Sequence, residues 1–409
     1  MSRLIFVNRF FFPDHSATSQ ILSDLAFHLA GSGRDVQVVT SRQVYDDPKA
    51  ALPGHDIVNG VHVHRIPSTH FGRSSLLGRS IDYASFYRSI RRCLSALAVH
   101  GDVVIVKTDP PLLSVAAMAP VRRNGARLVN WLQDIYPETA AILGVPLMRG
   151  PVANGLAALR DRSLRRSAAS VVVGELMARR IANRGAAETD IHVIANWCND
   201  TVIRPLAAEQ NPLRRQMDLT GKFVLGYSGN LGRAHDHETV LGAAEQLRHD
   251  PRYVFLMVGG GKRFADLADM VRRRGLDSAF RFLPYQPSSL LRECLTLPDA
   301  HWLTLNPRLE GLIVPSKFYG IAAAGKPMIF IGAKDGELAR LVRQHACGVV
   351  VAPGDAGTLV ATLQRWSDAP AAVAEMGARG RAMLDARFTR QHALAHWSDF
   401  LDRLDRGTS

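Results

Sequence analysis

Short apolar runs alternate with longer helical patterns along the whole chain, and this rhythm constrains the fold more than any other feature. The stretch Ser19–Ala30, for example, places its apolar residues on one helical face. Such alternation is typical of a parallel sheet with helices on both faces. The expected strands are Leu4–Val7, Val36–Val39, Val61–Ile66, Val103–Val106, Leu128–Leu132, Val171–Val173, Ile191–Ile194, Phe223–Tyr227, Tyr253–Val258, Phe280–Leu283, His301–Leu305, Pro327–Ile331 and Gly348–Val351.

The alternation pauses once, near residue 200. Asn196–Asp200 and Arg204–Pro212 are rich in turn formers, and the strands resume after them. With 409 residues the chain is long enough for two domains of ordinary size. We therefore expect two doubly wound, Rossmann-like α/β domains, at residues 1–200 and 206–385, facing each other across a cleft. Ligands of such sheets bind at the carboxyl ends of the strands.

Composition narrows the class of protein. The net charge of +13 attracts anions, so nucleic acid, anionic lipid and phosphate-bearing small molecules are the partners to consider. The basic residues are dispersed and form no recognisable nucleic-acid reader, which ranks nucleic acid last. The cysteines form no C-x-x-C pair and predict reduced cytosolic thiols. No apolar run approaches the roughly 20 residues of a membrane span, so we expect a soluble or peripherally attached protein.

Two polar segments follow strands of the first expected domain. In Arg9–Gln20 the free amides suit a phosphate or sugar at a helix N-terminus, although an ordinary N-cap by Ser16 or Thr18 is the favoured explanation of this segment alone. The second segment is Trp131–Glu138, in which Asp134 and Glu138 could bind sugar hydroxyls or accept a proton. Alternatively, one of them caps the next helix.

Two segments of the second domain also follow strands. Gly226–Arg233 combines three glycines, which allow close backbone approach, with an arginine fork suited to phosphate oxygens. In Glu310–Gly320 the acid could hold sugar hydroxyls, while Lys317 and the turn amides could hold a diphosphate. Acid, glycine and lysine on one strand–helix loop favour a binding role over a plain helix start.

The cluster His235–Glu238 invites a metal interpretation. Neighbouring residues on one helix turn rarely converge on one ion, so a helix start with solvated polar residues is the prediction.

A basic, aromatic stretch in the first domain has two interpretations. Its spacing fits a membrane-interface helix, and it equally fits a core-facing helix with a solvated basic back. Its residues are His70, Phe71, Arg73, Leu76, Leu77, Arg79, Tyr83, Phe86, Tyr87, Arg88, Arg91 and Arg92.

Five of these segments together resemble the family 4 glycosyltransferases of the GT-B fold, in particular bacterial fucosamine-type transferases of colanic-acid, capsule and O-antigen assembly. The matching segments are Phe12–Gln20, Asp109–Leu112, Gln133–Glu138, Tyr227–Arg233 and Pro315–Gly320. The resemblance spans nearly the whole chain. It implies a nucleotide-sugar donor held mainly by the second domain, an acceptor held by the first, retention of anomeric configuration and no required metal. It also implies a C-terminal helix, at about 386–409, that returns to the first domain.

The resemblance also assigns roles to residues. It implies catalytic roles for Asp134, Glu310 and Arg233, with Arg233 neutralising the donor diphosphate. The implied donor-binding residues are Ser16, Ala17, Gly229, Asn230, Arg233, Gly259, Glu310, Gly311, Leu312, Ile313, Ser316 and Lys317. The implied acceptor-binding residues are His15, Thr18, Asp109 and Glu138.

Two positions depart from the family pattern. Many members carry a second glutamate that grips the ribose, and here that position is Phe318 or Gly320, depending on the alignment. Many also carry a lysine five positions after the arginine, where this chain has Glu238. Lys317 is our candidate for the missing cation.

The sequence thus predicts a cytoplasmic enzyme, peripheral on the inner membrane, that transfers sugar from a nucleotide sugar, a UDP-sugar, to a lipid-linked saccharide. No cofactor and no nucleic acid are expected. The alternatives are a sugar-nucleotide 2-epimerase on the same architecture and a non-catalytic nucleotide-sugar-binding protein. An epimerase would need no acceptor, and measured turnover would exclude a binding protein.

Overall fold

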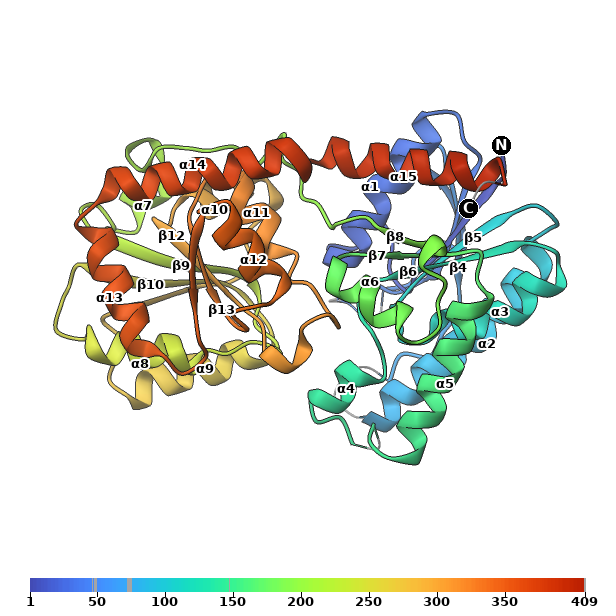
Figure 1. The fold of residues 1–409 in the computed structure, drawn as a ribbon, viewed down its shortest axis with the longest axis horizontal. Helices are drawn as coiled ribbons and strands as arrows, with labels where there is room; N and C mark the ends of the chain where they lie inside the picture. Colours follow the sequence, from blue (N-terminus) through green and yellow to red (C-terminus); the bar gives the residue numbers. More distant parts are fainter. Residues whose placement is uncertain (46, 48–49, 72–75, 147, 408–409) are drawn as a thin grey trace. The chain divides into compact units, whose positions relative to one another are not determined.

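A computed structural model describes residues 1–409 except 46, 48–49, 72–75, 147 and 408–409 (Figure 1). The chain divides into two compact units, Met1–Ala195 with Ala393–Ser409, and Asn196–His392. The first unit therefore ends a few residues before the expected position 200. The returning segment begins later than 386, because helix α14 (Pro370–Arg387) belongs to the second unit.

The sheet of the first unit has the strand order β3-β4-β2-β1-β5-β6-β7-β8. Its strands are β1 Leu4–Val7, β2 Val36–Ser41, β3 His55–Val58, β4 Val61–Ile66, β5 Val103–Lys107, β6 Arg127–Leu132, β7 Ala169–Val172 and β8 Ile191–Val193. The α-helices of this unit are α1 Ala17–Gly31, α2 Leu76–Leu97, α3 Leu113–Arg123, α4 Glu138–Ile142, α5 Pro151–Arg166, α6 Glu175–Ala182 and α15 Arg390–Asp405, and η1 Glu188–Asp190 is a 3₁₀ turn.

Strand β3 is absent from the sequence prediction, and it breaks the expected parallel pattern. It pairs antiparallel with β4 at the sheet edge, and Val58 faces Val61 across the two-residue turn Asn59-Gly60. Both turn residues have positive φ, 49° and 80°, as a tight hairpin turn requires. The strand is largely exposed and polar, so it lacks the apolar run by which the other strands were found.

The sheet of the second unit has the order β11-β10-β9-β12-β13-β14, and these neighbours pair in parallel. Its strands are β9 Phe223–Asn230, β10 Tyr253–Gly260, β11 Phe280–Leu283, β12 Ala300–Thr304, β13 Met328–Ile331 and β14 Gly348–Val351. Its helices are α7 Pro212–Gln216, α8 Glu238–Gln246, α9 Lys262–Arg273, α10 Leu291–Thr296, α11 Lys317–Ala323, α12 Glu337–Gln344, α13 Ala356–Ser367 and α14, with 3₁₀ turns η2 Ala208–Gln210, η3 Ser288–Leu290 and η4 Pro307–Leu309.

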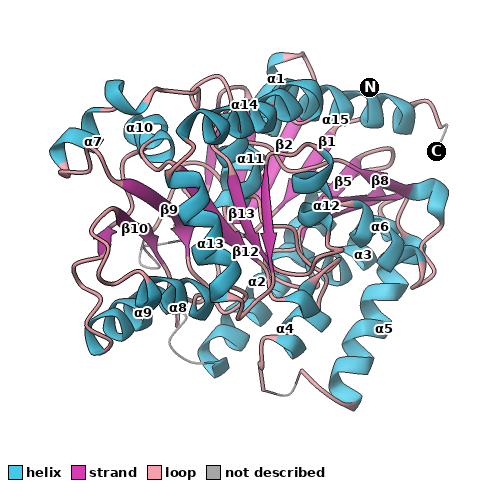
Figure 2. Ribbon diagram, turned by 60° about the vertical axis from the view of Figure 1, so that its left-hand side comes forward, coloured by secondary structure: helices cyan, strands magenta, loops and turns pink. Residues whose placement is uncertain are grey.

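Helices cover both faces of each sheet (Figures 1 and 2). In the first unit Ile5 and Val104 pack with Phe86 and Ile90 of α2. In the second unit α8, α9 and α13 contribute to one large apolar cluster on the sheet. Because both faces are buried, polar groups that meet a ligand must lie at the strand ends. Within the described ranges, no helix is both long and apolar enough to cross a bilayer.

Candidate functional site

The carboxyl ends of β9 and β10 approach so closely that only glycine fits between them. Gly229 and Gly259 lie opposite each other with φ of 116° and 131°. A Cβ atom on Gly259 would lie 2.3 Å from the carbonyl oxygen of Gly229. The strand β9 also continues through Gly229 and Asn230, beyond the end expected at Tyr227. Two of the predicted donor-binding glycines, Gly229 and Gly259, therefore lie side by side at the strand ends. Because neither has a side chain, a ligand could approach the backbone closely there.

Lys317, at the start of α11, lies across this glycine stretch. A Cβ atom on Gly229 would be 2.8 Å from its Cε. Its Nζ donates to the carbonyl of Asn230 at 3.2 Å and lies 5.2 Å from the ring centroid of Tyr227. Burial lowers the pKa of Lys317 to about 8. The structure thus brings Lys317 to the glycine segment, with two ammonium protons left to donate elsewhere.

Arg233 lies within the turn Gly232–His235, which hydrogen bonds between its two end residues close. The Nδ1 atom of His235 accepts from the Gly232 amide at 2.8 Å, and burial lowers the pKa of His235 to about 3, so this imidazole is neutral. Arg233 itself is exposed, and it forms no hydrogen bond or ion pair in the part of the chain that the structure describes. Its guanidinium is therefore available to an anionic ligand.

Glu310 follows η4, and its carboxylate lies at the N-terminus of α12. Its Oε2 accepts from the amide of Glu337 at 3.2 Å. A Cβ atom on Gly336 would lie 2.2 Å from Oε1, so the carboxylate lies directly against this glycine. Burial raises the pKa of Glu310, and the amide of Glu337 opposes this. After it, Gly311 and Leu312 are buried, whereas Ile313 and Ser316 keep partial exposure.

The two positions that depart from the family pattern offer no free carboxylate or cation. Phe318 is fully buried in the second unit, and Gly320 has no side chain. Glu238, at the start of α8, accepts a hydrogen bond from Arg274 at 2.8 Å.

The cluster lies at the start of α8, as predicted, but it is only partly solvated, because Glu238 is exposed and His237 is not. His237 is buried, and burial lowers its pKa. Asp236 accepts from the hydroxyl of Thr239 at 3.0 Å. Among the described residues, no three His, Cys, Asp or Glu side chains form a group that could hold a metal ion.

In the first unit, the loop after β1 is organised by a buried carboxylate. Asp14 accepts from the amide and hydroxyl of Ser16, at 2.8 and 2.5 Å, and from the Tyr45 amide. Ser16 is the N-cap of α1, but its side chain makes no capping hydrogen bond. His15 and Ala17 are exposed and Thr18 is half-exposed. These side chains are thus available at the carboxyl end of β1.

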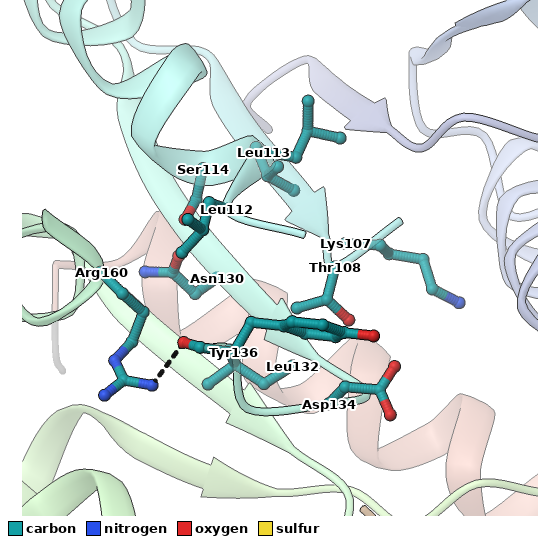
Figure 3. A pocket seen from close by; sticks show the side chains of 11 residues that line it. Lys107, Thr108, Leu112, Leu113, Ser114, Asn130, Leu132, Asp134, Tyr136 and Arg160 are labelled. Carbon is teal, nitrogen blue, oxygen red and sulfur yellow. Dashed lines mark hydrogen bonds between the residues drawn. The ribbon is translucent and has the colours of Figure 1, made fainter. Parts of the chain in front are cut away.

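Asp134 lines a small pocket between the ends of β5 and β6 (Figure 3). Burial, together with the smaller effect of the nearby Asp109 charge, raises the pKa of Asp134 to about 7. Tyr136 and Thr108 lie at the same end of the pocket as the Asp134 carboxylate in Figure 3. Neither Asp134 nor Glu138 caps α4, whose N-cap is Pro137. Asp134 is therefore a carboxyl group that titrates near neutral pH beside a polar pocket.

Glu138 is engaged in an ion pair. Arg160 of α5 donates to its two oxygens at 2.8 and 3.0 Å, and also to the carbonyl of Tyr136. Burial alone would raise the pKa of Glu138, but the hydrogen bonds and charge of Arg160 lower it. The pair joins α4 to α5.

Lys107, which the sequence prediction missed, is a buried lysine on the same pocket. It is the last residue of β5, and its Nζ donates to the carbonyl of Thr18 at 2.9 Å. A signal was present, because a charged residue ends an otherwise continuous apolar run, Val103–Val106.

Comparison with known families accounts for both units. A model described as glycosyl transferase 4-like domain matches residues 17–197, and one described as glycosyl transferases group 1 matches residues 209–383. The two matches together cover most of the chain. The chain is a family 4 glycosyltransferase of the GT-B fold. The matched order also agrees with the order of the two units.

The alignments with several related glycosyltransferases and solved structures cover most of this chain. The putative colanic acid biosynthesis glycosyl transferase WcaI of Escherichia coli K12 is 27% identical over 366 residues, covering 86% of this chain and 89% of WcaI. The probable glycosyltransferase WbjE of Pseudomonas aeruginosa is 26% identical, covering 71% and 72%. Sucrose-phosphate synthase of Thermosynechococcus elongatus has a TM-score of 0.79 at 16% identity over 100% of both chains. Anabaena HepE in complex with UDP-glucose has a TM-score of 0.72 at 15% identity, covering 98% and 100%.

The similarity to these structures establishes the fold. The predicted site residues of this glycosyltransferase fall into two groups, one in each unit. The glycine stretch, Arg233, Glu310 and Lys317 lie at strand ends of the second unit. The loop after β1, Asp109 and Asp134 lie at strand ends of the first unit. Among the predicted acceptor residues, Glu138 is held in an ion pair by Arg160 of α5.

Proposed function

We propose that this glycosyltransferase moves a sugar, with retention of anomeric configuration, from a UDP-sugar to a lipid-linked saccharide during assembly of a bacterial surface polysaccharide. The reaction needs no metal ion. The names of the relatives WcaI and WbjE and the UDP-glucose complex of HepE support this choice.

The observation that carries the proposal is the arrangement of charges in the second unit. Breaking the sugar–phosphate bond builds negative charge on the diphosphate and positive charge on the sugar ring. Arg233 and the protons of Lys317, beside the glycine stretch, would stabilise the departing diphosphate. The Glu310 carboxylate, fixed by the Glu337 amide, would bind the donor sugar.

The first unit supplies a group for the acceptor. Asp134 has a pKa raised to about 7 by burial, so its charged form is lost as the pH falls through 7. In this role it orients the acceptor hydroxyl and accepts its hydrogen bond. We expect kcat/KM to fall below pH 7 in the wild type and this acid limb to disappear in Asp134→Asn. An unchanged acid limb in that variant contradicts the assignment.

The central test uses a panel of UDP-, GDP- and dTDP-sugars, with and without a polyprenyl-diphosphate-linked saccharide, in the presence of EDTA. We expect one donor to be transferred, and NMR of the product to show retention. Glu310→Gln and Arg233→Ala should lower turnover by about 100-fold. Glu375→Gln and Arg215→Ala, which remove exposed charges elsewhere in the second unit, are the matched controls. If the wild type binds no nucleotide sugar, the proposal is wrong.

We also propose peripheral contact with the anionic cytoplasmic face of the inner membrane. Helix α2 carries an exposed basic face, Arg88, Arg91 and Arg92, and its exposed Leu77 and Ile81 are 74% and 41% accessible. Such a helix binds anionic headgroups through charge and the acyl boundary through its apolar side chains. Arg73, part of the basic stretch, lies outside the described residues.

Vesicle sedimentation tests this contact. The wild type should bind vesicles that contain phosphatidylglycerol, bind neutral vesicles poorly, and release in high salt. Replacing Arg88, Arg91 and Arg92 by serine should abolish binding. Equal binding to anionic and neutral vesicles would argue against it.

A further inference from the structure

Lys107 is the most unusual ionisable group of the first unit. It ends the central strand β5, and only 1% of its surface is exposed. In the described part of the chain no carboxylate forms an ion pair with it. Lysines are rarely fully buried, and an unpaired buried charge is costly. A residue of this kind at a strand's carboxyl end therefore calls for a functional explanation.

Two contacts fix the ammonium group. Its Nζ lies 2.9 Å from the carbonyl oxygen of Thr18, in the first turn of α1. The same atom lies 3.9 Å from the ring centroid of Trp131 on the neighbouring strand β6. The first contact ties β5 to α1, and the second is a cation–π interaction in a desolvated place.

Trp131 is itself held firmly. Its ring lies 4.5 Å from that of Trp397 on α15 and 6.5 Å from that of Phe6 on β1. The lysine therefore extends from an aromatic cluster in the sheet core to the first turn of α1. Its hydrogen bond to the Thr18 carbonyl therefore restricts the position of the first turn of α1 relative to the sheet.

The N-terminus of α1 carries residues that the family resemblance assigns to the ligands of the proposed reaction, Ser16 and Ala17 to the donor and Thr18 to the acceptor. Thr18 is held directly, and Ser16 and Ala17 precede it at the N-terminus of the helix. Misplacing such groups by about 1 Å can cost about 100-fold in rate. We infer that Lys107 is a positioning residue for glycosyl transfer: it holds the first turn of α1 by donating to Thr18 and is not needed for folding. This inference rests on the proposed function.

The test compares Lys107→Met with wild type. Methionine keeps the length of the side chain but has no N–H donor. We expect kcat/KM for transfer to fall at least about tenfold. The Kd for UDP should stay within about twofold of wild type, because the second unit carries its own donor site. Hydrogen exchange should rise in a peptide covering residues 14–24 and stay unchanged in β5 and β6.

A second variant and a control complete the design. Lys107→Gln restores an N–H donor without the charge, and we expect it to recover part of the lost kcat/KM. Lys222→Met removes a lysine beside the amino end of β9 and should behave as wild type.

The outcomes separate the two proposals. A wild-type enzyme that transfers no sugar overturns the proposed function itself. Active wild type with a fully active Lys107→Met variant overturns only the positioning role. A Lys107→Met variant that does not fold, or that loses UDP binding together with its thermal stability, also overturns that role, because Lys107 would then be structural.

Discussion

Replacing Lys107 by methionine should make the protein more stable near neutral pH. Burial lowers the pKa of Lys107 from 10.5 to about 7, which corresponds to about 5 kcal/mol of destabilisation when the group is charged. The variant loses the hydrogen bond to Thr18 and the cation–π contact with Trp131. These losses cost about 3 kcal/mol together. We therefore expect the free energy of unfolding at pH 6.5 to rise by about 2 kcal/mol.

The gain should depend on pH in a defined direction. Between pH 7 and 10.5 the unfolded wild type binds a proton at Lys107 that the folded protein has released. Wild-type stability at this site therefore rises with pH, and the penalty falls to about 2 kcal/mol at pH 9. The methionine variant lacks this titration, so its advantage should vanish just above about pH 8 and become a deficit of about 1 kcal/mol at pH 9.

Urea unfolding followed by tryptophan fluorescence at pH 6.5 and pH 9 measures both quantities, since Trp131 lies beside the substitution. Lys222→Met serves as the control for removal of a lysine that does not line this pocket. A variant less stable than wild type at pH 6.5, by an amount that is the same at pH 9, would refute the reasoning. It would mean that the contacts of Lys107 outweigh the cost of burying it.

Three further substitutions test other parts of the structure. Gly229→Ala places a Cβ at φ 116° and 2.8 Å from Lys317 Cε, so nucleotide-sugar turnover should fall at least about tenfold in a protein that still folds. Arg160→Met leaves the part-buried Glu138 carboxylate with the more distant, exposed Arg184 at 3.5 Å, so urea unfolding should show a loss of about 3 kcal/mol, most of which Glu138→Gln in the same chain should restore. Trp397→Ala empties the aromatic contact beneath α15 and should lower the stability of the first unit by about 3–5 kcal/mol, visible as an earlier thermal transition.

Much of the fold could be predicted because the strands are buried on both faces. Continuous apolar runs such as Val103–Val106 mark strands even without a partner in view. Strand β3 escaped this rule because it is a largely exposed edge strand with polar residues. The Asn59-Gly60 turn was the better signal, since its two positive φ angles are those of a hairpin.

The predicted site was harder to resolve, because similar residues take different roles. Asp134 and Glu138 look alike in the sequence, four positions apart after one strand. Arg160, which pairs with Glu138, comes from a helix 22 residues later, and no such cation pairs with Asp134 among the described residues. Lys107 was missed for the same reason, because its partners Thr18 and Trp131 are distant in the chain.

The sequence by itself determined the two-unit α/β organisation, the glycine stretch at Gly229 and the segments that carry Arg233 and Glu310. These features depend on the apolar periodicity and the backbone conformation of residues that are neighbours in the chain. Only the tertiary structure decided which ionisable groups are paired, buried or available. Charge state and pairing depend on burial and on side chains brought together from distant segments, as in Glu138 with Arg160 and Lys107 with Thr18. Such contacts arise only when the sheet and its helices close around them.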